Sequence, residues 1–281
     1  MITVLVTGSS GSLGQAIIDR LNKAATYHIV ATSRDGGDGY TQLDVCDTKQ
    51  LTELICEIKP ELILHLAATF DNDFDKAYAV NVDATKNILE AVLLSESNSR
   101  VLLVGSAAEY GVILPEENPV SEDHVLNPVS VYGLTKAWQT QLAGVYYARG
   151  VDVVVARVFN LYGDNVSERL FVGRLQKQID DVLSGRKTVI ELGSLSASRD
   201  YVSVDEAAAQ IVTIAKSGES GQIYHVASGK VVVMRDMLLR LLEKNKLDVS
   251  IVRESEELSN RSGYDVPVIY ADMTKASKLE A

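Results

Sequence analysis

The sequence predicts an α/β fold in which helices cover both faces of a parallel sheet. Two features favour this class: short β-branched and apolar runs alternate with stretches of helical spacing, and a glycine-rich turn follows the first apolar run. Alternating strands and helices are joined by right-handed crossovers, which make the strands parallel and place helices on either side. We therefore expect a doubly wound sheet with a smaller lobe towards the C-terminus.

The predicted elements follow one another along the chain. The predicted strands share a short apolar composition typical of strands buried on both faces, and they are ITVLVTG, HIVATSR, LILHLAA, RVLLVGS and VDVVVARVF. The predicted helices share helical spacing of their apolar residues; they run from Ser12 to Lys23, along LTELICEIKP to Pro60, from Asp75 to Ser95 and from Tyr132 to Arg149.

The alternation loosens after about residue 160, and this change sets the expected domain boundaries. Residues 1–160 are expected to form the sheet domain, and residues 195–220 are expected to return to it. Residues 161–194 and 221–281 are expected to form the smaller lobe.

Composition limits the possible partners. Hydrophobic residues make up 46% of the 281-residue chain and only 5 residues are proline, as in a globular protein. The net charge of −11 argues against nucleic acid, which is bound by basic surfaces. No apolar run has membrane-spanning length and no leader opens the chain, so we expect a cytoplasmic protein without a membrane partner. Cys46 and Cys56 lack metal-site spacing; both are expected to be reduced and structural, and no metal site is expected.

The stretch VTGSSGSLGQA places three glycines where the first strand ends and the first helix begins. In this G-x-x-G-x-x-G spacing Gly8 permits a tight turn, Gly11 lets the backbone approach a pyrophosphate, and Gly14 lets the helix pack close to the strand. The context predicts a dinucleotide site of the Rossmann type. The residues assigned to it in this loop are Gly8, Ser10, Gly11, Ser12, Leu13 and Gly14.

The second strand ends in ATSRD, which bears on the choice of cofactor. An acidic residue at this end would bind the ribose 2′-hydroxyl of NAD, but Ser33 and Arg34 stand there and suit a 2′-phosphate. The residues therefore favour NADP(H). In the alternative, Arg34 is a solvated surface residue and Asp35 or Asp38 binds the ribose of NAD(H). In the stretch LDVCD that follows, Asp44 and Val45 are expected to contact the adenine.

Tyr132 and Lys136 lie four residues apart in SVYGLTKAW, so they share one helix face. A phenol with a pKa of about 10 is a weak acid at neutral pH, and a nearby ammonium would lower that pKa. The lysine is also expected to hold the nicotinamide ribose. Ser106, at the carboxyl end of RVLLVGS, is expected to hydrogen-bond a substrate oxygen while Tyr132 transfers a proton. The alternative is an unrelated tyrosine and lysine on a surface helix.

Seven stretches in order resemble the extended short-chain dehydrogenase/reductase family of nucleotide-sugar enzymes: TGSSGSLG, LHLAA, VNVDATKNILEA, GSAAEYG, YGLTK, RVFNLYG and SRDYVSVDE. The segment from Glu109 to Ala137 is most similar to the branch of GDP-4-keto-6-deoxy-D-mannose reductases, which form GDP-D-rhamnose. The resemblance implies a catalytic set of Ser106, Tyr132 and Lys136. It also implies that Asn81 lies near the cofactor. The further residues assigned to cofactor binding are Leu66, Ala67, Ala68 and Phe159.

The resemblance also narrows the reaction. Dehydratases of the family carry an acid in the two positions after the catalytic Ser or Thr, and here those positions are Ala107 and Ala108. Glu109 follows one place later and is expected to be structural. Two reactions remain: reduction of a 4-keto sugar nucleotide by NADPH, and 4-epimerisation on tightly held NAD. A third possibility is a non-catalytic protein that senses the cofactor, but the retained Tyr132 and Lys136 weigh against it.

The resembled family also suggests where a sugar nucleotide binds. Asn160 and Arg199 are implied to contact the diphosphate, and arginine suits this role because it binds phosphate through two hydrogen bonds. Other residues assigned to the substrate are Ser106, Val172, Arg174, Lys177 and Arg261, the last as a second phosphate contact or else a loop cation. His65 is expected to be a packed strand residue. Family analogy predicts a homodimer through the helices at 75–95 and 132–149.

Overall fold

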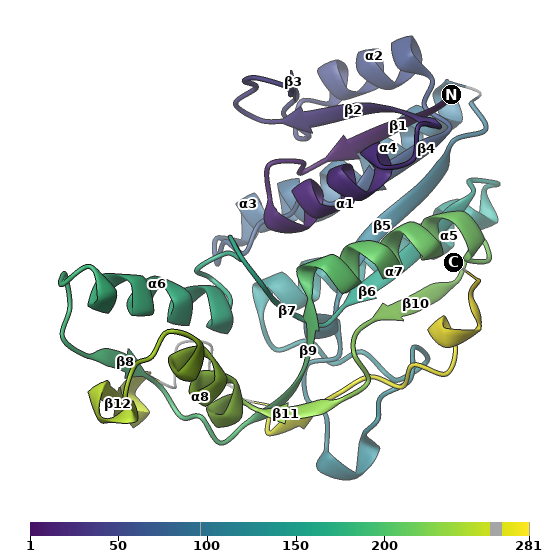
Figure 1. Ribbon diagram of the computed structural model, residues 1–281. Helices are drawn as coiled ribbons and strands as arrows, with labels where there is room; N and C mark the ends of the chain where they lie inside the picture. Colours follow the sequence, from purple (N-terminus) through teal and green to yellow (C-terminus); the bar gives the residue numbers. More distant parts are fainter. Residues whose placement is uncertain (96, 259–265, 281) are drawn as a thin grey trace.

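The computed structural model describes residues 1–95, 97–258 and 266–280. It confirms the predicted α/β fold: a seven-stranded sheet has the order β10-β6-β5-β4-β1-β2-β3, and all of its strand pairs are parallel (Figure 1). These strands are β1 (Ile2–Thr7), β2 (Tyr27–Ser33), β3 (Thr41–Gln42), β4 (Leu62–His65), β5 (Arg100–Ser106), β6 (Val153–Val158) and β10 (Ile223–Val226).

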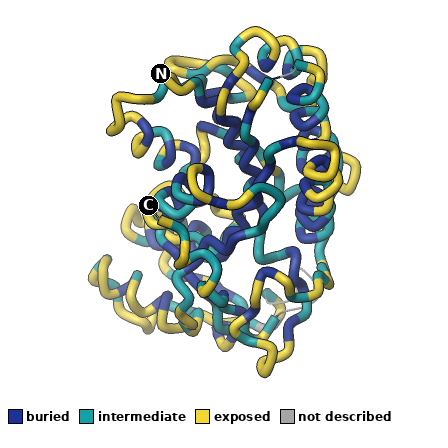
Figure 2. The backbone as a smooth tube through the Cα atoms, turned by 90° about the vertical axis from the view of Figure 1, so that its right-hand side faces the viewer, coloured by how far each residue is buried: buried dark blue, intermediate teal, exposed yellow. Residues whose placement is uncertain are grey.

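Helices cover both faces of this sheet. One face is packed by α1 (Ser12–Asn22) and α7 (Val204–Ser217), and the other by α2 (Thr48–Ile58), α4 (Ala84–Leu94) and α5 (Val131–Ala148). Strands β4 and β6 lie between the two helical layers, and their residues, which are mostly apolar, are buried throughout. Figure 2 shows this buried centre surrounded by exposed helix surfaces and loops.

The predicted helix at 75–95 is three consecutive pieces in the structure. Helix α3 (Phe74–Tyr78) leads into a π-helical turn at Ala79–Asp83, and α4 follows without a break. The predicted homodimer through this region and α5 stays a prediction.

The smaller lobe carries α6 (Phe171–Leu183) and α8 (Met234–Lys244), which lie at the lower left of Figure 1. Their apolar faces pack together with β8 (Ile190–Leu192) and β12 (Val252–Glu254), which pair in parallel. A second sheet joins the lobe to the large sheet; it contains β7 (Asn160–Tyr162), β9 (Ser198–Ser203), β11 (Val231–Val233) and β13 (Val268–Ile269). Within 195–220, therefore, α7 packs on the large sheet while β9 lies in the second sheet.

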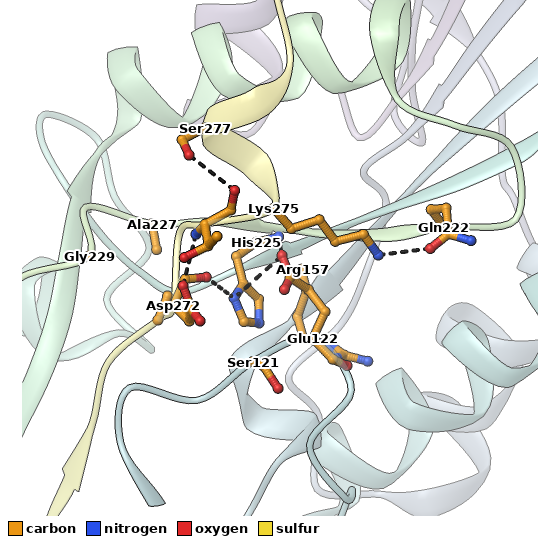
Figure 3. A network of polar contacts seen from close by, with 12 residues as sticks. Ser121, Glu122, Arg157, Gln222, His225, Ala227, Gly229, Asp272, Lys275 and Ser277 are labelled. Atoms are coloured by element: carbon orange, nitrogen blue, oxygen red, sulfur yellow. Dashed lines mark hydrogen bonds and ion pairs between the residues drawn. The ribbon is translucent and has the colours of Figure 1, made fainter.

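Residues 221–226 return to the large sheet, although the predicted boundary placed them in the smaller lobe. Strand β10 pairs with β6 at the sheet edge. Two hydrogen bonds then hold later residues there: His225 Nδ1 donates to the Asp272 carbonyl at 2.9 Å, and Lys275 Nζ donates to Gln222 Oε1 at 2.8 Å (Figure 3). Residues 221–226 thus pack with the large sheet, since β10 needs β6 as its hydrogen-bonding partner.

Cys46 and Cys56 are free, as the sequence predicted, but both are exposed, so neither is the buried structural thiol expected. None of the helices described is long and apolar enough to span a bilayer.

Candidate active site

A cavity of about 750 Å³ lies at the carboxyl edge of the large sheet. Its walls come from the ends of β1, β4, β5 and β6, and the chain reverses its winding direction between β1 and β4. Ligands of doubly wound sheets bind at such a switch point. The cavity brings together most of the predicted residues, namely Gly8, Ser10, Gly11, Ser12, Leu13, Gly14, Leu66, Ala68, Ser106, Tyr132, Lys136, Phe159, Asn160 and Arg199.

The three glycines of the loop are glycine for different physical reasons. Gly8 has φ +71°, and a Cβ there would come within 2.7 Å of the Ala67 nitrogen. At Gly14 a Cβ would come within 2.5 Å of the Gly8 carbonyl oxygen. At Gly11, however, a Cβ would meet nothing closer than 3.5 Å. The protein's own packing therefore requires Gly8 and Gly14, whereas Gly11 leaves space on the cavity wall for a ligand.

The N-terminus of α1 faces the same wall. Gly11 is the residue before the helix, and no side chain caps the helix there. The amides of the first turn therefore keep their hydrogen-bonding capacity for an anion, which the helix dipole also favours. A dinucleotide pyrophosphate fits this loop.

The residues predicted to set the cofactor choice lie beyond the cavity wall, on the outer strands. Ser33 Oγ donates to the Gly36 carbonyl at 3.0 Å, so it is engaged in its own turn. The Arg34 side chain is 78% exposed and lies 3.7 Å from Asp35. Asp44 accepts a hydrogen bond from the Cys46 amide at 2.9 Å. Because β2 neighbours β1 in the sheet, Arg34 follows a strand next to the glycine loop, and its contact with a cofactor stays a prediction, as do those of Asp44 and Val45.

Asn81 does not line the cavity, which corrects its assignment as a cofactor residue. It is fully buried, and its Nδ2 donates to the Thr69 carbonyl at 3.1 Å and to Thr135 Oγ1 at 2.9 Å. Its Oδ1 accepts from the Thr69 amide at 2.9 Å. Since all of these groups are committed inside the protein, Asn81 fastens the loop after β4 to helix α5.

His65 is the packed strand residue that the sequence predicted. It is fully buried, and its Nδ1 lies 2.8 Å from Thr7 Oγ1. Burial, helped by the nearby Lys136 charge, lowers the pKa of His65 to about 3. The imidazole is therefore neutral at physiological pH and takes no part in acid–base chemistry there.

Ser106, Tyr132 and Lys136 lie together on one side of the cavity. Ser106 caps a short 3₁₀ turn at Ala107–Glu109, and its Oγ accepts from the Ala108 amide at 3.2 Å. The Ser106 hydroxyl lies close enough to the Tyr132 phenol to lower the phenol pKa, although burial has the larger effect. Helix α5 supplies the other two groups from its first turns, and Ser130 caps that helix by accepting from the Gly133 amide at 3.0 Å.

The electrostatics of this trio differ from the sequence prediction. Burial raises the pKa of the Tyr132 phenol to about 12, against a smaller opposing effect of the Ser106 hydrogen bond. Lys136 does not lower it in this structure, because its ammonium points to the sheet, donating to the Val104 carbonyl at 2.5 Å and to Gln139 Oε1. Burial also lowers the pKa of Lys136 to about 8. Tyr132 is thus a protonated group, suited to donating a proton rather than accepting one.

Two site residues were missed at the sequence level. The Phe70 ring lies 4.3 Å from the Tyr132 ring between centroids, and Phe70 lines the cavity. Arg169 reaches across from the loop before α6 and donates from Nη1 to the Phe70 carbonyl at 3.0 Å. Both residues come from loops without periodic pattern, so only their positions after LHLAA and before the α6 stretch pointed to them.

The described cavity lining contains no Asp, Glu, His or Cys. Ala107 and Ala108 lie beside Ser106 in that lining, as the sequence implied. Glu109 is outside the lining, fully buried, and its Oε2 lies 3.0 Å from Arg157 Nη2. Within the part of the cavity that the structure describes, Tyr132 and Lys136 are therefore the titratable side chains nearest to Ser106 on that wall.

A second cavity of about 700 Å³ continues from the first over the smaller lobe, and the two share Asn160 and Arg199. Arg174 and Lys177 line it, as predicted. Asp181 also lines it and lies 2.6 Å from the Lys177 ammonium, so part of the positive charge is balanced. The shared Arg199 sits where a group spanning both cavities would pass.

The assignment of Val172 to substrate binding is wrong. Val172 is 1% exposed and packs against Tyr201 and Met237, away from both cavities. The physical reason is helical geometry: Val172 and Arg174 are two residues apart and point to different sides of α6. Arg261 lies outside the described residues.

Comparison with known proteins agrees with this geometry. Residues 4–227 match the NAD dependent epimerase/dehydratase family. The chain is 24% identical over 258 residues to GDP-6-deoxy-D-mannose reductase of Pseudomonas aeruginosa, covering 89% of this chain and 83% of that protein. It is 30% identical over 256 residues to UDP-glucose 4-epimerase of Mycolicibacterium smegmatis, covering 83% and 79%.

Among solved structures, RMD from Pseudomonas aeruginosa complexed with NADPH has the same fold, with a TM-score of 0.87 at 20% identity. The similarity covers 99% of this chain and 92% of that chain. The family match spans most of the sequence and contains both the glycine loop and the tyrosine helix. The chain belongs to the NAD dependent epimerase/dehydratase family of nucleotide-sugar-modifying enzymes.

Proposed function

We propose that the protein reduces the 4-keto group of a nucleotide-linked 4-keto-6-deoxyhexose, with NADPH as the reductant. The observation that carries this proposal is the composition of the catalytic wall. Ser106 and Tyr132 are followed there by Ala107 and Ala108, and the described lining holds no carboxylate or imidazole. Dehydration needs a base for the C5 proton and an acid for the departing hydroxyl. Reduction of a ketone needs one hydride and one proton, which matches a site with a single proton donor.

The protein's groups have separate tasks in this reaction. A bound nicotinamide supplies the hydride that adds to C4. Ser106 hydrogen-bonds the ketone oxygen, and Tyr132 donates its proton to that oxygen as negative charge develops on it. Lys136 lines the cavity beside them and would hold the nicotinamide ribose. Phe70 packs over Tyr132 and keeps bulk water from its ring face.

The glycine loop would hold the cofactor pyrophosphate, as argued from Gly11 and the α1 N-terminus. Arg34 has the charge and exposure to bind a 2′-phosphate, and Ser33 lies beside it. No carboxylate stands at the last position of β2 to bind the two ribose hydroxyls of NAD. These features favour NADP(H) over NAD(H).

The sugar nucleotide would span the two cavities. Asn160 and Arg199, which both cavities share, would contact the diphosphate, and the nucleoside would lie in the second cavity with Arg174 and Lys177. Support for a deoxysugar comes from the relative named GDP-6-deoxy-D-mannose reductase.

A second candidate is a nucleotide-sugar 4-epimerase on tightly held NAD. It is favoured by the 30% identity to UDP-glucose 4-epimerase of Mycolicibacterium smegmatis. The Asp35 carboxylate, 3.7 Å from Arg34, also offers a group for ribose hydroxyls. An epimerase needs the same trio, because the hydride leaves and returns within one site.

Two measurements separate the candidates. The purified protein is heated and the released nucleotide identified; stoichiometric NAD favours the epimerase, and a protein free of cofactor favours the reductase. Loss of NADPH absorbance is then followed with a GDP-linked 4-keto-6-deoxy sugar, with NADH as the matched comparison. Turnover with a clear preference for NADPH supports the proposal. Interconversion of UDP-glucose and UDP-galactose without added cofactor would contradict it.

A further inference from the structure

The buried carboxylate of Glu109 lies directly under the catalytic loop. Its Oε1 accepts from the Ser106 amide at 2.7 Å, and its Oε2 accepts from Thr140 Oγ1 at 2.8 Å and from Arg157 Nε at 3.0 Å. Glu109 and Arg157 are 0% and 1% exposed. A buried charge is costly, so it is retained only where its partners satisfy it fully, as they do here.

Thr140 connects this carboxylate to the tyrosine helix. Tyr132, Lys136 and Thr140 follow one another at intervals of four on α5, so they share the helix face that meets the end of β5. The first two line the cavity, and the third hydrogen-bonds Glu109. One carboxylate thus holds the backbone of Ser106 with one oxygen and the helix that carries Tyr132 with the other.

Two close approaches show that the loop at Ser106–Glu109 and helix α5 are tightly packed against each other. A Cβ at Gly105 would lie 2.6 Å from Glu109 Oε1, so the carboxylate fits only under a glycine. A Cβ at Gly133 would lie 2.4 Å from the Ala108 carbonyl oxygen, so α5 touches the catalytic loop at its first turn as well. The loop and the helix are therefore in contact at both ends of the Tyr132–Thr140 face.

We infer that Glu109 and Thr140 are positioning residues that fix the distance between the Ser106 and Tyr132 hydroxyls. The inference rests on the proposed role of those hydroxyls. Neither residue is in the described cavity lining. The Glu109 carboxylate fixes the position of the Ser106 backbone, and its hydrogen bond with Thr140 fixes the position of α5 relative to that backbone. A shift of a few tenths of an ångström between the two hydroxyls would weaken proton donation without removing any catalytic group.

The test removes only the link to the helix. Thr140→Val keeps the shape of the side chain and leaves the Glu109–Arg157 pair intact. We expect kcat to fall about tenfold, while KM for the sugar nucleotide and Kd for NADPH stay within about twofold, because only the proton-transfer geometry changes. Thr140→Ser, which restores the hydroxyl, should return kcat to within about twofold of the wild type.

Ser99→Ala is the matched control. Ser99 is 2% exposed, and its hydroxyl donates to the Pro60 carbonyl at 2.5 Å, at the opposite end of the sheet from the cavity. It loses one buried hydroxyl, as Thr140→Val does, and kcat should not change. Glu109→Gln is the second variant; it should lower kcat more than Thr140→Val and lower Tm as well, since Arg157 loses its charged partner.

Amide hydrogen exchange of residues 104–110 supplies a readout that needs no substrate. The inference predicts faster exchange of this loop in Thr140→Val than in the wild type or in Ser99→Ala, because Ser106 is held less firmly. Wild-type protein that reduces no 4-keto sugar nucleotide would refute the proposed function, and exchange would then decide the inference alone. Unchanged kcat and unchanged loop exchange in Thr140→Val would overturn it, as would an equal loss of kcat in Ser99→Ala.

Discussion

The two cavities that meet at Asn160 and Arg199 are built in different ways. The first lies at the ends of buried parallel strands, and its described lining has no carboxylate or imidazole. The second lies over the smaller lobe and is lined by both signs of charge, including Lys177 and Asp181. Lys177 and Arg186 hydrogen-bond the Asp181 carboxylate and hold its pKa below the usual range.

The two cavities therefore differ in how rigidly their side chains are held. In the first, the Ser106 backbone is held by the buried Glu109 carboxylate, and the Lys136 ammonium is held by the Val104 carbonyl and Gln139. In the second, partly exposed ion pairs can rearrange around a ligand at small energetic cost. Under the proposed function we therefore expect the reaction type to depend on the first cavity and the choice of nucleotide to depend on the second.

The largest expected effect tests whether the first cavity has one proton donor. Tyr132→Phe removes the phenol hydroxyl and keeps the ring that packs on Phe70. We expect kcat to fall about 1000-fold while NADPH Kd changes little, because the described lining has no carboxylate or imidazole to replace the phenol and the Lys136 ammonium is engaged by Val104 and Gln139. Steady-state kinetics and cofactor titration measure both. Unchanged turnover would show that the proton comes from elsewhere.

The next effect tests whether Gly11 serves the ligand rather than the fold. In Gly11→Val we expect NADPH Kd to rise roughly 100-fold with little change in Tm, since a Cβ there meets no close protein neighbour. Gly14→Ala is the contrasting variant. Its Cβ would press on the Gly8 carbonyl, so it should lose about 1–3 kcal/mol of stability. Equal loss of Tm in the two variants would refute the distinction.

The pH profile tests the charge of Lys136. Burial lowers its pKa to about 8, so Lys136 is a cation below that pH and becomes neutral as pH rises through it. If the cation holds the nicotinamide ribose, kcat/KM should be steady below about pH 8 and fall roughly tenfold per unit above it. Tyr132, with a pKa of about 12, stays protonated over this range. A profile that rises with pH through 8 would contradict this role.

The prediction with the smallest expected effect tests whether Arg199, which both cavities share, binds the diphosphate of the substrate. Arg199→Lys keeps the positive charge but loses the paired donors that fit a phosphate. We expect KM for the sugar nucleotide to rise roughly fivefold with kcat within about twofold. Arg253→Lys, on the exposed surface of β12, is the control and should leave both constants unchanged. A fall in kcat alone would place Arg199 with the chemistry of the first cavity.

The sequence was most informative where a local pattern determines geometry. The i, i+4 spacing of Tyr132 and Lys136 and the strand–turn–helix position of Gly8, Gly11 and Gly14 each predicted residues that the structure brings to one cavity. Such patterns work because helix and turn geometry are set by neighbouring residues.

The sequence was least informative where tertiary packing decides. Which face of α6 is exposed depends on its packing against α8, so the sequence did not show that Val172 is buried. The loop contact of Phe70 with Tyr132 has no periodic signal at all. The spacing predicted that Lys136 would lower the pKa of Tyr132, whereas burial raises that pKa, and burial cannot be read from the spacing of two residues.

The most direct test of the central claim follows the hydride itself. The protein is incubated with NADPH carrying deuterium at the transferable C4 position and with a GDP-linked 4-keto-6-deoxy sugar, and the product is examined by NMR and mass spectrometry. If NADPH reduces the 4-keto group directly, each product molecule carries a single deuterium at C4 of the sugar, and an equal amount of NADP⁺ is formed. A product formed with no deuterium at C4 would contradict the account, because the hydride would then not have come from the added NADPH.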